Sequence, residues 1–303
     1  MRKRWNRNTI KQGGAGYYTF QVISMLFFLL FAFVCVYPFW YVLIYSLSDP
    51  MRSATGLTWL PRGLTLRHFE IVFNMPGIFN AFLISSLRAL VGTVITLFFS
   101  SMFAYVLSKP SMPGRLIIYR VMVISMYISV GLIPWYLTMR LYGLQNNFLL
   151  YVLPGAITAY YVILIKTFIE GLPEALDEAA LIDGANHFQI FTLIILPVSK
   201  PVLAAVAVFS AVGQWNSWTD NFFLVNKSNL QTLQYMLYLL LRQTEAIAAA
   251  VRSRNITAAQ NAVITPMAIR MTATVVTIIP IIMVYPFLQK YFVKGILLGA
   301  VKA

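Results

Sequence analysis

Hydrophobic residues are gathered along this chain in long runs, which polar segments containing Gly and Pro interrupt. A bilayer core needs about 20 mostly apolar residues per helix, and six runs approach or exceed that length. They are residues 20–45, 78–107, 116–137, 148–169, 191–215 and 271–289. The pattern predicts an all-α membrane protein with six transmembrane helices.

Composition supports this interpretation. Hydrophobic residues make up 59% of the 303, charged residues 11%, and the mean hydropathy is +0.74, which leaves too little polar surface to coat a soluble globule of this size. No internal repeat is evident. We therefore expect one transmembrane domain over residues 1–303, with an N-terminal tail (1–19), an acidic segment (170–190) and a long loop (216–270) that includes a helical piece near 230–250.

The distribution of basic residues predicts the orientation. Thirteen of the 23 Lys and Arg residues lie in the N-terminal tail, the 108–115 loop, the C-terminal tail or the span ends next to the 108–115 loop and the 170–190 segment. Short loops rich in Lys and Arg stay on the cytoplasmic side. We expect both termini and the acidic segment to be cytoplasmic, the 216–270 loop to be extracellular, and the protein to be a multi-pass protein of the cell membrane.

Several function classes lack the residues they need. Ion-coupled transporters usually carry carboxylates inside the membrane, and the acids here map to predicted loops, so an ion-coupled secondary solute transporter is the disfavoured alternative. No Gly-Lys dipeptide is present, which excludes the common phosphate-cradling loop. His68 and His187 lie far apart in predicted loops, and H-E-x-x-H is absent. We expect no enzyme activity, no metal and no catalytic residue in this chain.

The acidic segment is the unusual feature of this basic chain. It contains five of the nine acids: Glu170, Glu174, Asp177, Glu178 and Asp183. If Pro173 occupies the first turn of a helix, the first four form one stripe opposite an apolar face. The spacing predicts a short two-faced helix on the cytoplasmic side.

The residues that follow predict a knob that docks on another protein. Ala179 and Ala180 are small enough for close approach, Asp183-Gly184 can turn through a left-handed conformation, and a second helical piece over 186–190 leads into the next span. The alternative is an amphipathic helix lying on the membrane. It fits less well, because such helices carry Lys and Arg on their polar face.

At this point the residues resemble a known family. Glu178-Ala179-Ala180-x-x-Asp183-Gly184-Ala185, followed by Leu196-Pro197, closely resembles the EAA loop of permease subunits of binding-protein-dependent ABC importers. Six spans with a long outer loop before the last resemble the maltose-type carbohydrate permeases. Residues 286–295 and Trp215-Asn-Ser-Trp218 resemble the subfamily for aldouronate, pectin-derived or other complex oligosaccharides.

The resemblance implies a type I ABC importer permease fold and a bacterial membrane complex. This chain would form half of a translocation pathway for an oligosaccharide, with a uronic-acid-containing one as a candidate. Its partners would be a second, different permease, two ATP-binding subunits that hold ATP and Mg, and an extracellular solute-binding lipoprotein, with no nucleic acid and no cofactor of its own. The implied ATPase-coupling residues are Glu174, Glu178, Ala179, Ala180, Asp183, Gly184, Ala185 and Pro197, with Glu178 as the polar contact and Gly184 as the turn.

Four residues are candidates for the substrate pathway. Trp215, Asn216 and Trp218 lie at the predicted outer end of the fifth span and suit a sugar, although Trp residues also form the aromatic belt of membrane proteins. Arg88 lies inside a predicted span and could face an acidic sugar. The favoured alternative is that Arg88 extends to the outer membrane interface.

Overall fold

The computed structural model describes residues 15–49, 59–128, 130–254 and 267–283. The regular elements in these ranges are helices, which confirms the all-helical prediction for this part of the chain. They are α1 (Ala15–Ser46), α3 (Arg67–Phe73), α4 (Ile78–Ser108), α5 (Arg115–Tyr127), α6 (Leu132–Leu141), α7 (Leu149–Val152), α8 (Ala159–Glu170), α9 (Ala175–Ile182), α10 (His187–Gln189), a π-helix (Ile190–Ile195), α11 (Leu196–Val198), α12 (Lys200–Asn216), α13 (Thr219–Leu224), a 3-10 helix (Ser228–Leu230), α14 (Leu233–Arg254) and the helix Met267–Met283.

The chain divides into two compact units. The first comprises residues 1–69 and 260–275, and the second comprises 70–259 and 276–303. In the first unit, α1 exposes apolar side chains along most of its length, except in its last turns, and is long enough to cross a membrane. His68, expected in a solvated loop, is instead 1% exposed in α3, with its Nδ1 3.3 Å from the Ser46 carbonyl oxygen.

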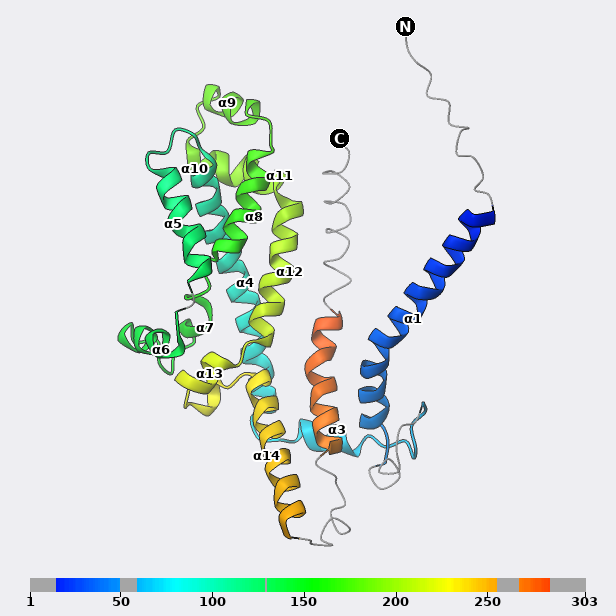
Figure 1. Cartoon of the computed structure of the whole chain (residues 1–303). Coiled ribbons are helices and arrows are strands. Elements are labelled where there is room, and N and C mark those ends of the chain that lie inside the picture. Colours follow the sequence, from blue (N-terminus) through cyan, green and yellow to red (C-terminus); the bar gives the residue numbers. More distant parts are fainter. Residues whose placement is uncertain (1–14, 50–58, 129, 255–266, 284–303) are drawn as a thin grey trace. The chain divides into compact units, whose positions relative to one another are not determined.

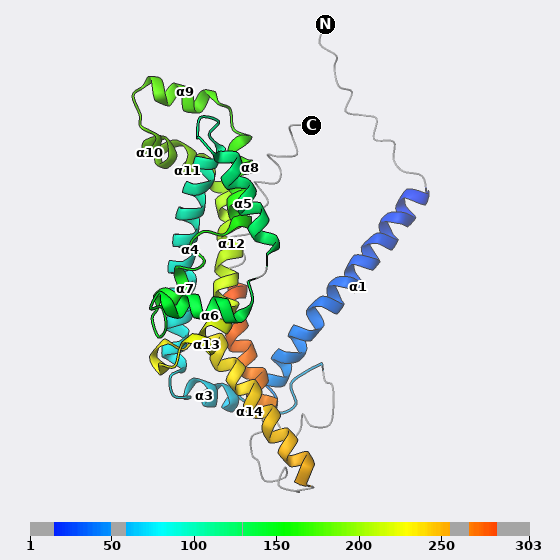
Figure 2. The ribbon, with the colours of Figure 1, turned by 60° about the vertical axis from the view of Figure 1, so that its left-hand side comes forward.

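The second unit is built around α4, which packs against α12 and α8 (Figures 1 and 2). Small polar residues of α4 are buried at these contacts and allow close approach of the neighbouring helices. Thr96 Oγ1 donates to the Gly155 carbonyl at 2.9 Å, and Ser100 Oγ donates to the Ala156 carbonyl at 3.3 Å. At one end of the unit, Tyr105 joins a core cluster with residues of α8, α9, α12 and the π-helix.

Two described helices, α1 and α4, are long and apolar enough to cross a membrane. A third span is present if the bent pair His187–Val198 and Lys200–Asn216 counts as one. The helix Met267–Met283 is apolar but shorter. The count of six spans and the cytoplasmic position of both termini therefore remain predictions, and residues 1–14 and 284–303 lie outside the described part.

Three predicted spans are not single straight helices. Residues 116–137 divide into α5 and α6, because Pro134 cannot donate a helical hydrogen bond across the junction. Residues 148–169 divide into α7 and α8 around Pro154-Gly155. Residues 191–215 bend by 81° near Ser199, where Pro201 has no N–H to donate to the carbonyl of Pro197.

The elements that carry the candidate sites lie at opposite ends of α4 in the second unit. Figure 1 shows α9 at one end and α13 with α14 at the other. α14 confirms the predicted helical piece within the 216–270 loop. At about 1.5 Å per residue, α4 is some 45 Å long, which exceeds the roughly 30 Å of a bilayer core.

Candidate coupling segment and buried ion pair

The acidic segment folds as a short helix that begins later than the sequence suggested. Pro173 precedes α9 instead of occupying its first turn. Glu170 belongs to α8, where it pairs with Lys166 at 2.6 Å, so the predicted stripe of four acids on one helix is wrong at that position. Asp177 and Glu178 lie in the first turn of α9, where carboxylates stabilise the positive end of the helix.

The turn after α9 is closed by hydrogen bonds at both ends. Gly184 has a φ of 80°, which confirms the predicted left-handed turn. The N–H groups of Gly184 and Ala185 donate to the carbonyls of Leu181 and Ala180, both at 3.0 Å, in a Schellman arrangement. Asn186 then begins α10 with a reciprocal capping box. Hydrogen bonds between residues that are close in sequence therefore fix the path of the chain from the end of α9 through the turn to α10.

The turn presents a mixed acidic and apolar surface. Ile182 is 86% exposed and Phe188 59% exposed, which is unusual for such large apolar side chains clustered on one short segment. Of the predicted coupling residues, six are exposed: Glu174, Glu178, Ala179, Asp183, Gly184 and Pro197. Ala185 is half-buried, and Ala180 is buried in the core cluster with Tyr105. The structure brings all of them onto α9 and its turn except Pro197, which lies on α11.

A polar cavity of about 460 Å³ lies between α9 and the turn from α4 to α5. Lys109, which ends α4, forms an ion pair with Asp177 of α9 across this cavity. The Lys109 Nζ also lies 4.4 Å from the ring centre of Tyr105, a distance at which a cation and an aromatic face attract each other. One side of α9 thus contacts the end of α4, and the other side is exposed.

Arg88 is not a free cation in this structure. Its side chain donates four hydrogen bonds: Nε to Gln214 Oε1 at 3.0 Å, Nη1 to the Ser217 carbonyl at 3.2 Å, and Nη1 and Nη2 to the two carboxylate oxygens of Asp220. Its guanidinium carbon lies 4.6 Å from the ring centre of Tyr151. Arg88 is 3% exposed and Asp220 7% exposed, so Arg88 neither extends to a membrane interface nor offers an unpaired charge to an acidic sugar.

A second polar cavity, of about 230 Å³, borders this ion pair. Gln214 of α12 lines this cavity and packs closely against Gly92 of α4. A Cβ added to Gly92 would lie 2.8 Å from Gln214 Nε2, so the absence of a side chain at this position is what makes room for the amide. Trp135 and Tyr161 also line the cavity. The lining combines aromatic faces with amide and hydroxyl groups, which is a surface suited to sugars.

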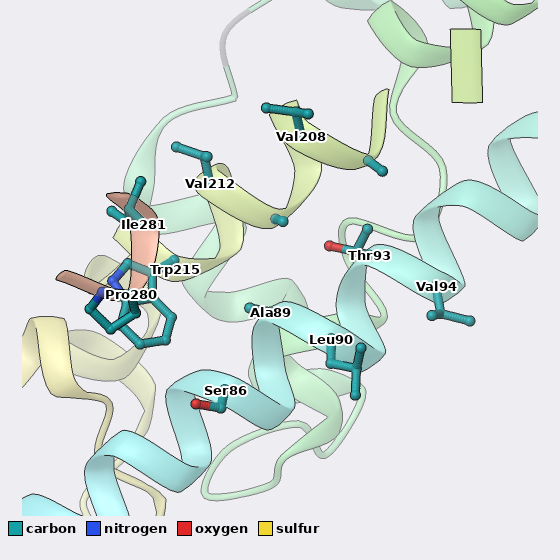
Figure 3. A pocket seen from close by; sticks show the side chains of 12 residues that line it. Ser86, Ala89, Leu90, Thr93, Val94, Val208, Val212, Trp215, Pro280 and Ile281 are labelled. Atoms are coloured by element: carbon teal, nitrogen blue, oxygen red, sulfur yellow. The ribbon is translucent and has the colours of Figure 1, made fainter. Parts of the chain in front are cut away.

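The tryptophans of the Trp215-to-Trp218 segment have structural partners. Trp215 is 7% exposed and donates from Nε1 to the Thr277 carbonyl at 3.1 Å. Figure 3 shows it beside an apolar groove of about 380 Å³ between α4, α12 and Pro280. Trp218 stacks on Tyr238 of α14 with ring centres 4.1 Å apart. Asn216 is exposed. The three side chains therefore do not converge on one cavity.

Comparison with known proteins decides the family. No model of a known protein family matches the chain. Individual proteins do: it is 35% identical over 284 residues to protein LplC of Bacillus subtilis (strain 168), covering 93% of this chain and 95% of that one. It is also 32% identical to the polygalacturonan/rhamnogalacturonan transport system permease protein YtcP of the same organism, covering 93% and 98%. The chain belongs to the sugar ABC transporter permeases.

A solved structure agrees with this family. The permease is similar to a chain of a bacterial ABC transporter involved in the import of the acidic polysaccharide alginate, with a TM-score of 0.81 and 27% identity over 92% of this chain and 99% of that one. The resemblance to oligosaccharide permeases is confirmed. The chain is a transport subunit of a membrane complex, and ATP is hydrolysed on separate subunits, so the secondary-transporter alternative falls.

Sequence reasoning gave no role at these sites to three residues of the permease, Lys109, Gln214 and Asp220, and it placed Asp177 in the acidic stripe without its partner. Asp220 could have been found from the sequence. Arg88 lies inside a predicted span, where a charge usually pairs with an opposite charge, and the chain has only nine acids that could be its partner. Lys109 and Asp177 are 68 residues apart, and no local pattern joins them. Gln214 is an ordinary residue of α12 until folding places it against Gly92.

Proposed function

We propose that this permease forms half of the translocation pathway of an importer and that α9 docks on a separate ATP-hydrolysing subunit. One observation carries the docking: α9 ends in a hydrogen-bonded turn that leads into the capped α10, and this segment exposes carboxylates and large apolar side chains together. An apolar surface with a charged rim is typical of a protein interface. In this arrangement Glu178 is the polar contact, Ala179 allows close approach, and Gly184 sets the turn.

The complex that this function needs follows the family. It comprises a second, different permease, two ATP-binding subunits that hold ATP and Mg, and an extracellular solute-binding lipoprotein. In the membrane, this chain crosses six times with both termini and α9 in the cytoplasm. The 216–270 loop, with α14, then faces the binding protein. Support comes from the family and from the excess of Lys and Arg near the proposed cytoplasmic segments.

The proposed cargo is an oligosaccharide, with uronic-acid-containing chains as the first class to test. The name of one relative refers to polygalacturonan and rhamnogalacturonan, and the similar solved transporter is named for alginate import. We place the 230 Å³ cavity beside Arg88 and Gln214 on the pathway. Because Asp220 neutralises Arg88, the cavity offers no free positive charge to a carboxylate, and we expect its polar groups to contact sugar hydroxyl groups. Arg88 then serves as part of the cavity lining. Trp215 and Asn216, at the end of α12, and Trp218, directly before α13, are proposed as the adjoining part of this pathway.

The first experiment is to purify the tagged chain from its native membrane in mild detergent and to identify the co-purifying subunits by intact mass. A second permease and two copies of an ATPase are expected. ATP hydrolysis by that complex is then measured with the binding protein and either oligogalacturonides or neutral oligosaccharides. A chain that purifies alone would refute the proposed complex, and stimulation by neutral sugars only would refute the uronic-acid cargo.

A further inference from the structure

The ion pair between Lys109 and Asp177 joins α9, the proposed coupling helix, to the end of α4. Lys109 directly follows α4, and its backbone N–H still donates to the Val106 carbonyl at 3.3 Å, so its position follows that helix. Asp177 lies in the first turn of α9. Their side chains are 19% and 27% exposed. The pair is therefore partly shielded from water, and the attraction is stronger than that of a fully exposed pair.

α9 makes only a small buried contact with the rest of the second unit in the described structure. Ala180 is its buried residue and packs in the core cluster with Tyr105, while Leu181 and Ile182 are 48% and 86% exposed. A small alanine contact alone leaves a helix free to rock, because it fixes one point of the helix axis. Asp177, one turn earlier, supplies a second point. Two attachment points on one face determine the direction of the helix.

The surroundings of Asp177 make Lys109 its necessary partner. In the described structure, Asp177 Oδ1 is buried and accepts no hydrogen bond, so Lys109 on the other oxygen provides its charge compensation. Lys109 in turn is fixed by its contact with the Tyr105 ring. Removing the Lys109 charge leaves a partly buried carboxylate without a counter-charge, which favours movement of α9 toward water.

We propose that Lys109 and Asp177 are positioning residues that transmit movement of the coupling helix to α4. The proposal rests on the proposed docking of α9 on an ATPase subunit. α4 is continuous from Ile78 to Ser108, and Arg88 lies about 30 Å along it from Lys109. A displacement of α4 at Lys109 therefore reaches the polar cavity beside Arg88. Without the ion pair, α9 moves together with the ATPase subunit, but α4 does not move with α9. ATP is then hydrolysed without transport of the sugar.

The test uses the whole complex in proteoliposomes with its binding protein and oligogalacturonides as the probe. Uptake and ATP hydrolysis are measured together in Lys109→Gln, in Lys109→Asp, and in the charge-swapped pair Lys109→Asp with Asp177→Lys. We expect the single variants to assemble but to import about fivefold less sugar per ATP, as for a coupling interaction of ordinary size. The charge-swapped pair is expected to recover uptake to within about twofold of the parent.

Lys166→Gln is the matched control. Lys166 also pairs with an acid, Glu170, and lies 4.6 Å from a tyrosine ring, that of Tyr119, but its acid partner is in the same helix. Its removal is expected to leave the sugar imported per ATP unchanged.

Three results would overturn the proposal: no recovery in the charge-swapped pair, an equal loss of coupling in Lys166→Gln, or a parallel fall of uptake and ATP hydrolysis with loss of assembly. If the binding protein does not change the rate of ATP hydrolysis by the parent complex, the proposed function is overturned, and this inference with it.

Discussion

The ion pair between Arg88 and Asp220 offers the sharpest test of how the second unit is held together. In Asp220→Asn the guanidinium keeps Gln214 Oε1 at 3.0 Å, the Ser217 carbonyl at 3.2 Å and the Tyr151 ring. It loses its only counter-charge in this network while remaining almost fully buried. Breaking a buried pair from one side typically costs about 3–5 kcal/mol. We expect about 3 kcal/mol here, because the remaining acceptors still solvate the cation.

Removing both charges should cost less than removing one. In Arg88→Gln with Asp220→Asn the two amides can still hydrogen-bond, and no uncompensated charge is buried. The expected cost is about 1 kcal/mol, the size of an ordinary lost hydrogen bond. The double variant is therefore more stable than Asp220→Asn alone, an order that simple counting of lost contacts would reverse.

Thermal unfolding of the purified complex in mild detergent, followed by intrinsic fluorescence, measures both effects. A loss of about 3 kcal/mol lowers the midpoint by about 5 °C for a chain of 303 residues, because the unfolding entropy is about 2.1 cal/mol/K per residue. Lys227→Gln, at an exposed residue near α13, is the control and should shift stability by less than about 0.5 kcal/mol. If Asp220→Asn behaves like Lys227→Gln, or if the double variant is the less stable of the two, the electrostatic reasoning is refuted.

Other substitutions test the polar cavity and the coupling turn. Gly92→Ala places a Cβ 2.8 Å from Gln214 Nε2; we expect lower sugar uptake at unchanged assembly, and normal uptake would remove the cavity from the pathway. Glu178→Arg and Gly184→Pro are expected to abolish uptake while membrane insertion is retained; ATP-dependent uptake in both would contradict docking through α9. Asn186→Ala removes a capping box and should cost about 1 kcal/mol, read as a lower unfolding temperature, whereas an unchanged midpoint would show that the cap does not stabilise the turn.

Local signals were predictable because they depend on neighbouring residues. Asp183-Gly184 after a short amphipathic run indicated the left-handed turn that Gly184 makes, and the apolar runs indicated α1 and α4 closely. The start of α9 was misplaced because Pro173 is compatible with both the first turn of a helix and the residue before it. The bend near Ser199 was missed because an apolar run conceals how Pro197 and Pro201 interrupt the hydrogen bonds.

The sequence by itself determined that this is an all-helical membrane protein with acidic residues gathered on one short segment, because composition, run length and turn residues act within a few positions of one another. Tertiary structure alone decided what the charges do. From the sequence, Arg88 was expected to be an unpaired cation. In the folded chain it pairs with Asp220, which is 132 residues away. Asp177 was one acid among several until α9 met Lys109. A charge interacts with whatever lies within a few ångströms, and in a folded chain those neighbours come from distant segments.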